Sequence, residues 1–328
     1  MIDIDKRIRD TFEAQKIRNM QLDPNGSCNA GCWFCPVRYV GNPEDAKTQM
    51  PVELLDKILS NLISERDSGG LVDPLFNGFY TSHYNEVLLY KYFEDLLKLS
   101  RKYKLIFMVL SNGTTLTPQK TDLLIEYQDV ISGVCLNIPC FEDELWSKRV
   151  NLPSKLFSKL VSNVRYFIDN HPMKLSIQVN GWDGKNTWLD KGKDFPVDLQ
   201  DDENEKQVEI AKSLFPEANV YQMPHLVDRA GHLHSVITNK NAIDRYHGEK
   251  QVIGCMNSYE NGGRPIGWIH VNANGECFLC CNDYNMEIKF GDFKTSELKD
   301  FWGQEDHINK IKHSYETICR QCASAKYE

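Results

Sequence analysis

Three cysteines lie within eight residues near the start of the chain, at Cys28, Cys32 and Cys35. Thiolates at this spacing can converge on one metal centre, and the small residues between the first two let the loop wrap closely around it. A structural zinc ion or a closed iron–sulfur cluster takes four ligands from the protein. Three cysteines therefore predict a metal centre with one coordination position open to another molecule. A Cys3His zinc site is the alternative, although the nearby loop contains no histidine.

A second group of cysteines lies near the end of the chain, where six of the eleven follow residue 250. Cys319 and Cys322 have the C-x-x-C spacing that metal sites use, and Cys277, Cys280 and Cys281 share one short segment. The N-terminus is charged throughout and does not resemble an export signal. We therefore expect these thiols to bind metal rather than to form disulfides.

The elements that must position these cysteines alternate between short apolar segments and longer amphipathic ones, from about residue 17 to about residue 225. The apolar segments predict strands at Arg18–Leu22, Pro74–Phe79, Leu105–Leu110, Ile131–Ile138, Leu175–Val179 and Val220–Gln222. The amphipathic segments predict helices near Pro51–Glu65, Leu89–Tyr103, Pro118–Tyr127, Pro153–Asp169 and Glu203–Leu214. This pattern predicts an α/β fold, a partial (β/α)6 TIM-like barrel with its chemistry at the carboxyl ends of the strands.

The character of the chain changes after residue 230, where only short strand signals remain, at Gly267–Val271 and Glu276–Leu279. We expect a small C-terminal domain built around metal. The predicted division is an N-terminal extension over 1–16, the barrel over 17–235 and the C-terminal domain over 236–328. The segment Trp182–Asp202 is rich in Asp, Lys and Gly, and we expect a solvated surface excursion there, with a lid over the site as the alternative.

The composition excludes several classes of protein. The 328 residues carry 38 Lys and Arg against 46 Asp and Glu, a formal net charge of -8, and contain no long basic run, so we expect no nucleic-acid partner. No apolar run reaches the roughly 18 residues that a membrane span needs, so we expect no membrane anchor and a cytoplasmic location.

The first cysteine string, C-x3-C-x2-C with Phe34 before its last cysteine, resembles the radical S-adenosylmethionine (SAM) enzymes. The resemblance implies that Cys28, Cys32 and Cys35 hold a [4Fe–4S] cluster whose fourth iron is chelated by the amino and carboxylate groups of SAM. It implies that an electron from this cluster, supplied by a flavodoxin- or ferredoxin-type donor, cleaves SAM to methionine and a 5′-deoxyadenosyl radical. That radical abstracts a hydrogen atom from the substrate. Phe34 is among the residues that the resemblance places beside SAM.

Further SAM-binding positions follow from the same resemblance, at the ends of later strands. After the second strand the chain lacks the family's glycine pair but keeps its acid, so Glu86 would receive the SAM ammonium group. A helix N-terminal glutamate is the alternative. The other implied positions are Tyr84 and Asn85 beside Glu86, Ser111 and Asn112 in a turn similar to the family's Thr-Asn-Gly-Thr, Asn180 near the ribose together with Gln178 and Val179, and Arg229 near the SAM carboxylate.

The tail resembles the twitch domain, a shortened form of the SPASM extension found in one subgroup of these enzymes. The resemblance implies an auxiliary [4Fe–4S] cluster, and its four ligands would be Cys255, Cys280, Cys319 and Cys322. Cys277 and Cys281 are the competitors for the place of Cys280. A zinc ribbon built from the same four thiolates is the alternative, since spacing alone does not separate zinc from iron–sulfur.

Together these motifs predict a radical SAM oxidoreductase that dehydrogenates a small hydroxylated substrate, such as a sugar, aminocyclitol or nucleotide derivative, with the auxiliary cluster accepting the second electron. Because few residues precede the first strand, we expect no separate leader-peptide-binding domain, which favours a small substrate. A peptide maturase or an epimerase is the alternative, with Cys140 as the thiol that returns a hydrogen atom. Cys135 is expected to be inert packing. Outside enzymes, an iron–sulfur electron-transfer protein or a zinc-binding module remains open.

Overall fold

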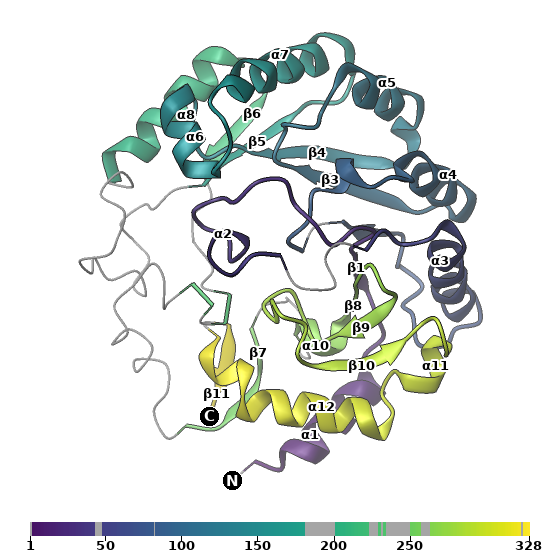
Figure 1. Ribbon diagram of the computed structural model, residues 1–328. Helices are drawn as coiled ribbons and strands as arrows, with labels where there is room; N and C mark the ends of the chain where they lie inside the picture. Colours follow the sequence, from purple (N-terminus) through teal and green to yellow (C-terminus); the bar gives the residue numbers. More distant parts are fainter. Residues whose placement is uncertain are drawn as a thin grey trace.

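Nine strands form one continuous sheet, and the helices between them run along its outer side (Figure 1). The computed structural model describes residues 2–42, 48–81, 83–180, 201–222, 229–230, 232–233, 250–256, 263–322 and 324–328. The strands are β1 (Asn19–Leu22), β2 (Gly78–Tyr80), β3 (Ile106–Ser111), β4 (Ile131–Asn137), β5 (Ser176–Val179), β6 (Asn219–Gln222), β8 (Trp268–Val271), β9 (Glu276–Phe278) and β10 (Lys289–Asp292). Strands β1 to β6 pair in parallel in chain order, so their carboxyl ends meet at one edge.

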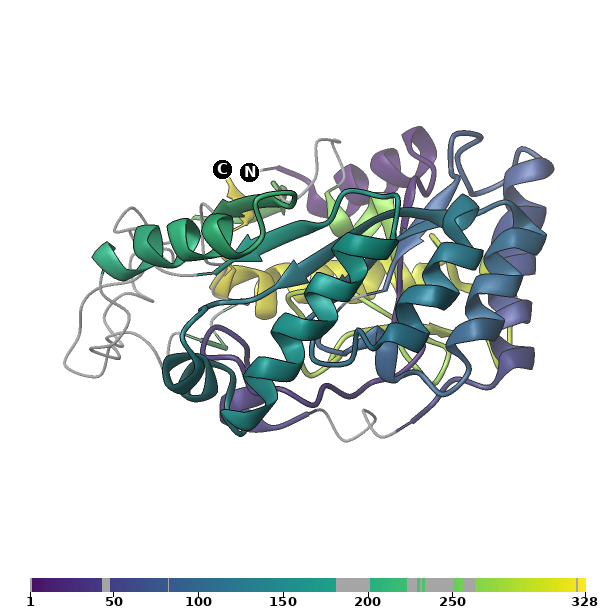
Figure 2. The ribbon, with the colours of Figure 1, turned by 90° about the horizontal axis from the view of Figure 1, so that it is seen from above.

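The helices that follow the barrel strands lie against the outer face of the sheet, and Figure 2 shows several of them side by side. They are α3 (Val52–Asp67), α4 (Phe93–Tyr103), α5 (Pro118–Glu126), α6 (Asp143–Val150), α7 (Lys155–Asn170) and α8 (Asp201–Leu214). The short helix α2 (Val37–Val40) belongs to the loop after β1 and lies inside the curve of the sheet (Figure 1). In α3, Leu55, Ile58, Leu59 and Leu62 are fully buried, because residues at this spacing share one helix face. This stripe holds α3 against the sheet.

The structure confirms the predicted fold class and the six barrel strands, with local differences. β2 begins at Gly78 rather than at Pro74, because Asp73 starts a turn in which its carbonyl oxygen accepts a hydrogen bond from the Phe76 amide (2.9 Å). The helix expected from Leu89 begins at Phe93, since a short 3-10 turn and an extended Tyr90 precede it. The short helix α6 was not predicted.

The C-terminal part continues the barrel sheet. β8 pairs in parallel with β1, which places Ile269 opposite Met20, and β9 and β10 extend this edge as antiparallel strands. A separate two-stranded sheet joins β7 (Val252–Cys255) to β11 (Ala325–Tyr327). The helices of this part are α10 (Arg264–Gly267), α11 (Leu298–Phe301) and α12 (Glu305–Glu316).

The N-terminal segment forms an unpredicted helix, α1 (Ile4–Ala14), which lies beside α12 (Figure 1). Ile4 and Ile8 share an apolar cluster with Ile308 and Ile311 of α12. The predicted extension thus packs on the C-terminal part. The division at residues 16 and 235 stays a prediction, because the sheet runs through both regions without a break.

No helix in the described part of the chain is long and apolar enough to cross a bilayer. The segment expected to be a surface excursion, Trp182–Asp202, lies outside the described residues apart from the start of α8.

Candidate functional site

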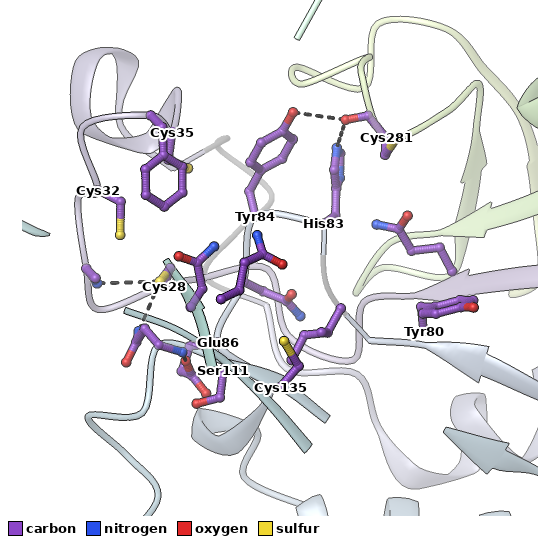
Figure 3. A pocket seen from close by; sticks show the side chains of 18 of the residues that line it. Cys28, Cys32, Cys35, Tyr80, His83, Tyr84, Glu86, Ser111, Cys135 and Cys281 are labelled. Carbon is purple, nitrogen blue, oxygen red and sulfur yellow. Dashed lines mark hydrogen bonds between the residues drawn. The ribbon is translucent and has the colours of Figure 1, made fainter. Parts of the chain in front are cut away.

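The loop after β1 carries Cys28, Cys32 and Cys35 at one end of a cavity (Figure 3). The end of α6 fixes this loop, because the Gly31 and Trp33 amides donate hydrogen bonds to carbonyl oxygens of α6, each at 2.8 Å. Those acceptors belong to Val150 and Arg149. The helix that sequence reasoning missed therefore holds the three-cysteine loop in shape.

The cavity has a volume of about 460 Å³ and opens over the carboxyl ends of the barrel strands. Leu110, Cys135 and Gln178, from β3, β4 and β5, line it opposite the cysteine loop. Most predicted SAM-binding residues also line it, namely Phe34, Tyr84, Asn85, Glu86, Ser111, Asn112 and Arg229. The structure therefore brings the first motif and the strand-end motifs together at one site.

The three thiols fit a metal centre. Burial raises the pKa of Cys28 to about 12 and that of Cys35 to about 11, and it raises the pKa of Cys32 well above the usual range. Thiolates at this depth need a cation to compensate their charge. The Ala30 amide and the Asn112 side chain donate hydrogen bonds to Cys28 Sγ at 3.4 and 3.6 Å, the kind of contact that tunes an iron–sulfur cluster.

Glu86 is fully buried and joins the loop after β2 to the turn after β3. Its Oε2 accepts a hydrogen bond from the Asn112 amide (2.8 Å), and its Oε1 accepts one from the Leu88 amide (3.3 Å), which caps a 3-10 turn. Burial raises the pKa of the Glu86 carboxyl, and the Asn112 amide opposes the shift. These contacts are those of a glutamate that caps a helical turn, the alternative to SAM binding, while the Glu86 carboxyl group still faces the cavity.

Asn112 lies directly against the cysteine loop. Its side-chain amide donates to Asn29 Oδ1 (2.8 Å) as well as to Cys28, while Asn112 Oδ1 accepts from the Thr114 amide (3.0 Å). Gly113 has φ +78°, which permits the tight turn that presents Asn112. The turn that resembles the family's Thr-Asn-Gly-Thr therefore lies beside the cysteine loop in the structure.

Two predicted residues do not reach the cavity. Asn180 is buried beside it and accepts a hydrogen bond from Gln178 Nε2 (2.9 Å), and Gln178 is the residue that lines the cavity. Cys140 belongs to the main apolar core, where its Sγ lies 3.8 Å from the Glu142 carbonyl oxygen. Cys140 is not among the described residues that line the cavity, so its role as a hydrogen donor stays a prediction.

Cys135 occupies the position that was expected for Cys140. Its Sγ lies 3.3 Å from Tyr221 Oη, and the side chain lines the cavity. The sequence could have indicated this position of Cys135, because alternate residues of a strand point to opposite faces and Cys135 therefore shares its face of β4 with Asn137. Asn137 also lines the cavity.

His83 and Cys281 also line the cavity and were not predicted as part of this site. The Cys281 carbonyl oxygen lies 3.0 Å from His83 Nε2 and accepts a hydrogen bond from Tyr84 Oη (2.9 Å), as Figure 3 shows. Asp23 Oδ1 accepts a bond from the His83 amide (2.9 Å), and Asp23 Oδ2 lies 3.5 Å from His83 Nδ1. These contacts tie the barrel loop after β2 to the C-terminal part.

A second, smaller cavity lies within the C-terminal part. Four cysteines line it, and they are Cys255, Cys280, Cys319 and Cys322. The competitors lie elsewhere, because Cys277 is fully buried in the main core and Cys281 faces the large cavity. The Asn282 side chain and the Ser324 amide donate hydrogen bonds to Cys322 Sγ at 3.3 and 3.4 Å.

The four cysteines of the small cavity supply the number of ligands that a metal centre takes from the protein. A tetrahedral zinc ion and a [4Fe–4S] cluster both accept four thiolates. The donor set and the apolar walls of the small cavity therefore fit an iron–sulfur cluster.

Comparison with known proteins decides the class of the C-terminal part. Residues 263–323 match the SPASM family, described as an iron–sulfur cluster-binding domain. Residues 263–323 are therefore similar to SPASM domains. The match includes Cys280, Cys319 and Cys322, while Cys255 precedes it. No curated protein matches the sequence.

The fold of the whole SPASM-containing chain is shared with solved structures of radical SAM enzymes. BtrN in complex with AdoMet (SAM) and 2-DOIA is 16% identical with a TM-score of 0.55, and the match covers 95% of this chain and 94% of BtrN. SuiB of Streptococcus suis, bound to precursor peptide SuiA, is 13% identical with a TM-score of 0.59 over 94% of this chain and 70% of SuiB. AnSMEcpe with bound AdoMet is 14% identical with a TM-score of 0.57 over 93% and 86%. These matches confirm the predicted radical SAM fold with a SPASM/twitch extension.

Proposed function

We propose that this SPASM protein is a radical SAM oxidoreductase that removes two electrons and two protons from a small hydroxylated substrate. The observation that carries the proposal is the arrangement of the two cysteine sites around one cavity. Cys28, Cys32 and Cys35 line one end of it, and Arg264 lines both this cavity and the small cavity with the other four cysteines. A substrate between the two sites could lose a hydrogen atom from carbon on one side and an electron on the other, and its hydroxyl proton would pass to solvent.

The residues of this chain have separate tasks in the proposal. Cys28, Cys32 and Cys35 hold a [4Fe–4S] cluster, and Cys255, Cys280, Cys319 and Cys322 hold the auxiliary cluster. When bound, the first cluster and SAM supply the radical that abstracts the hydrogen atom. Asn112 positions the cysteine loop, and Glu86 holds the turn that carries Asn112. Arg229 binds the SAM carboxylate, and Gln178 takes the ribose position expected for Asn180.

The size of the cavity and one structural relative favour a small substrate. The cavity of about 460 Å³ lies within the usual range for small-molecule sites and must hold SAM as well as the substrate. BtrN, whose length this chain matches almost completely, is seen with AdoMet and 2-DOIA. SuiB, bound to a precursor peptide, is matched over 70% of its length. The reductant in this proposal is a flavodoxin- or ferredoxin-type protein.

The test is isotope transfer from substrate to cofactor product. Candidate sugars, aminocyclitols and nucleotide derivatives carrying deuterium at the reacting carbon are incubated with the reduced enzyme and SAM. We expect deuterium in 5′-deoxyadenosine and one equivalent of ketone or aldehyde for each SAM cleaved. An epimer in which solvent hydrogen has replaced the deuterium would instead show that a hydrogen atom is returned, and it would overturn the assignment as a dehydrogenase.

A further inference from the structure

Arg264 occupies the wall between the large cavity and the small cysteine cavity, and it lines both. It is the first residue of α10 and follows Gly263, whose φ is +64°. A Cβ at Gly263 would lie 2.5 Å from Cys255 Cβ, so the backbone before Arg264 packs directly on a proposed cluster ligand. The position of the arginine is therefore fixed by the fold of the C-terminal part.

The guanidinium group of Arg264 is incompletely satisfied. It lies over the indole ring of Trp268, 4.2 Å from the ring centroid, and its Nη1 donates a long hydrogen bond of 3.4 Å to Gln21 Oε1. Its Nε is buried and has no hydrogen-bond partner. Within the described part of the chain, no carboxylate forms an ion pair with it. A guanidinium carries five N–H donors in a planar fork that matches carboxylate and phosphate oxygens.

The other charged groups of the cavity do not neutralise Arg264. The carboxylate oxygens of Glu86 already accept backbone hydrogen bonds at the opposite side, from Asn112 and Leu88. Arg229 also lines the cavity, with its guanidinium carbon 5.6 Å from the centroid of the Tyr84 ring, and it is the residue proposed to bind the SAM carboxylate.

The surroundings of Arg264 have the shape of a substrate subsite. Tyr80 stacks on Trp268 with ring centroids 5.3 Å apart, and both rings line the cavity. Figure 3 shows Tyr80 on the side of the cavity away from Cys32 and Cys35, so this wall is distinct from the place of the first cluster. A flat aromatic wall beside a guanidinium whose Nε–H lacks a partner among the described residues suits a small ring compound that carries an anionic group.

We propose that Arg264 binds an oxyanion, a carboxylate or a phosphate, on the substrate of this enzyme. The inference rests on the proposed function only in taking the large cavity as the substrate site. It narrows the substrate to an acidic hydroxylated compound, such as a sugar acid, sugar phosphate or nucleotide. Cationic aminocyclitols are disfavoured, because an ammonium group at this wall would lie against the Arg264 guanidinium.

The test measures anion binding directly, in the reconstituted holoenzyme with saturating SAM. Inorganic phosphate and malonate are titrated at constant ionic strength by calorimetry, so that the two arms separate a phosphate from a carboxylate site. We expect the wild type to bind at least one of them, and Arg264→Gln to weaken that binding about 10- to 100-fold, the range for losing a charged hydrogen-bond pair. Arg264→Lys keeps the charge and should lose less. Lys98→Gln, on the exposed face of α4, is the matched control for loss of one positive charge.

Three results would overturn the proposal. They are no binding of either anion by the wild type, equal binding by the wild type and Arg264→Gln, and binding that is lost in Arg229→Gln but kept in Arg264→Gln. The formation of 5′-deoxyadenosine is measured on the same samples. We expect it to persist in Arg264→Gln, since its loss would place Arg264 in SAM chemistry instead. Absence of 5′-deoxyadenosine in the wild type would count against the proposed function and leave the anion measurement intact.

Discussion

The two neighbouring cysteines of the C-terminal hairpin give the sharpest test of the second cluster site. Cys280 lines the small cavity, whereas Cys277, three residues earlier, is fully buried in the main core. Replacing Cys280 by Ala removes one of four proposed ligands, so iron should fall from about eight to about four atoms per chain. Replacing Cys277 by Ala should leave iron unchanged, because Cys277 is buried in the main core and is not among the described residues that line the small cavity.

The two variants should also differ in stability. Cys277→Ala deletes one buried sulfur atom from a packed core, which costs about 1–2 kcal/mol. Cys280→Ala loses the cluster that joins β7 to the last C-x-x-C segment, and the free energy of metal binding is part of the free energy of folding. The unfolding midpoint should therefore fall much further in Cys280→Ala.

The assay combines iron analysis, electron paramagnetic resonance of the reduced protein and thermal unfolding under anaerobic conditions. Cys281→Ala is a second control, since that side chain faces the large cavity and should keep both clusters. Eight iron atoms in Cys280→Ala, or loss of half the iron in Cys277→Ala, would show that the assignment of ligands from the cavity is wrong.

Three further predictions concern other parts of the chain. Replacing Cys28, Cys32 and Cys35 together by Ala should abolish SAM cleavage while iron analysis still finds about four atoms per chain, and retained cleavage would refute the role of this loop. Gly263→Ala should lower the unfolding midpoint and the auxiliary-cluster signal, because its Cβ would meet Cys255. The control is Gly69→Ala, where φ is +76° and the space around the added Cβ is open, so it should cost only about 1 kcal/mol of strain. Equal effects of the two variants would contradict the contact with Cys255 as the cause. Burial lowers the pKa of His307 to about 3, so the folded protein should lose stability as the pH falls below the unfolded pKa near 6.5, by at most about 1.4 kcal/mol per pH unit. His307→Phe should reduce this slope in unfolding scans between pH 5 and 7. An unchanged slope would show that His307 is not its cause.

The sequence predicted the features that depend on local spacing. The barrel strands are recognisable because a strand that is covered by helices is a short run of apolar residues. In β3, for example, Phe107 and Val109 are buried. The loop with Cys28 needed no tertiary information, because its three cysteines are neighbours in the chain. Cys280 was predicted over Cys277 as a cluster ligand from a motif. In the structure Cys280 lines the small cavity, and Cys277 lies in the main core.

The features that were missed depend on pairing between distant segments. Nothing local indicates that β8 pairs with β1, and this pairing brings Arg264 and Trp268 to the cavity. Cys140 was preferred to Cys135 because it lies nearer the strand end. Strand register decides instead which of them faces the cavity, and register is set by the neighbouring strands.

The central claim is that this chain holds two iron–sulfur clusters and cleaves SAM. The most direct measurement is anaerobic reconstitution with iron and sulfide, reduction with dithionite and addition of SAM, followed by assay of iron and 5′-deoxyadenosine per chain. We predict about eight iron atoms, four for each cluster, together with 5′-deoxyadenosine. About four iron atoms without 5′-deoxyadenosine, or zinc in their place, would contradict the claim, because the three-cysteine loop would then hold no working cluster.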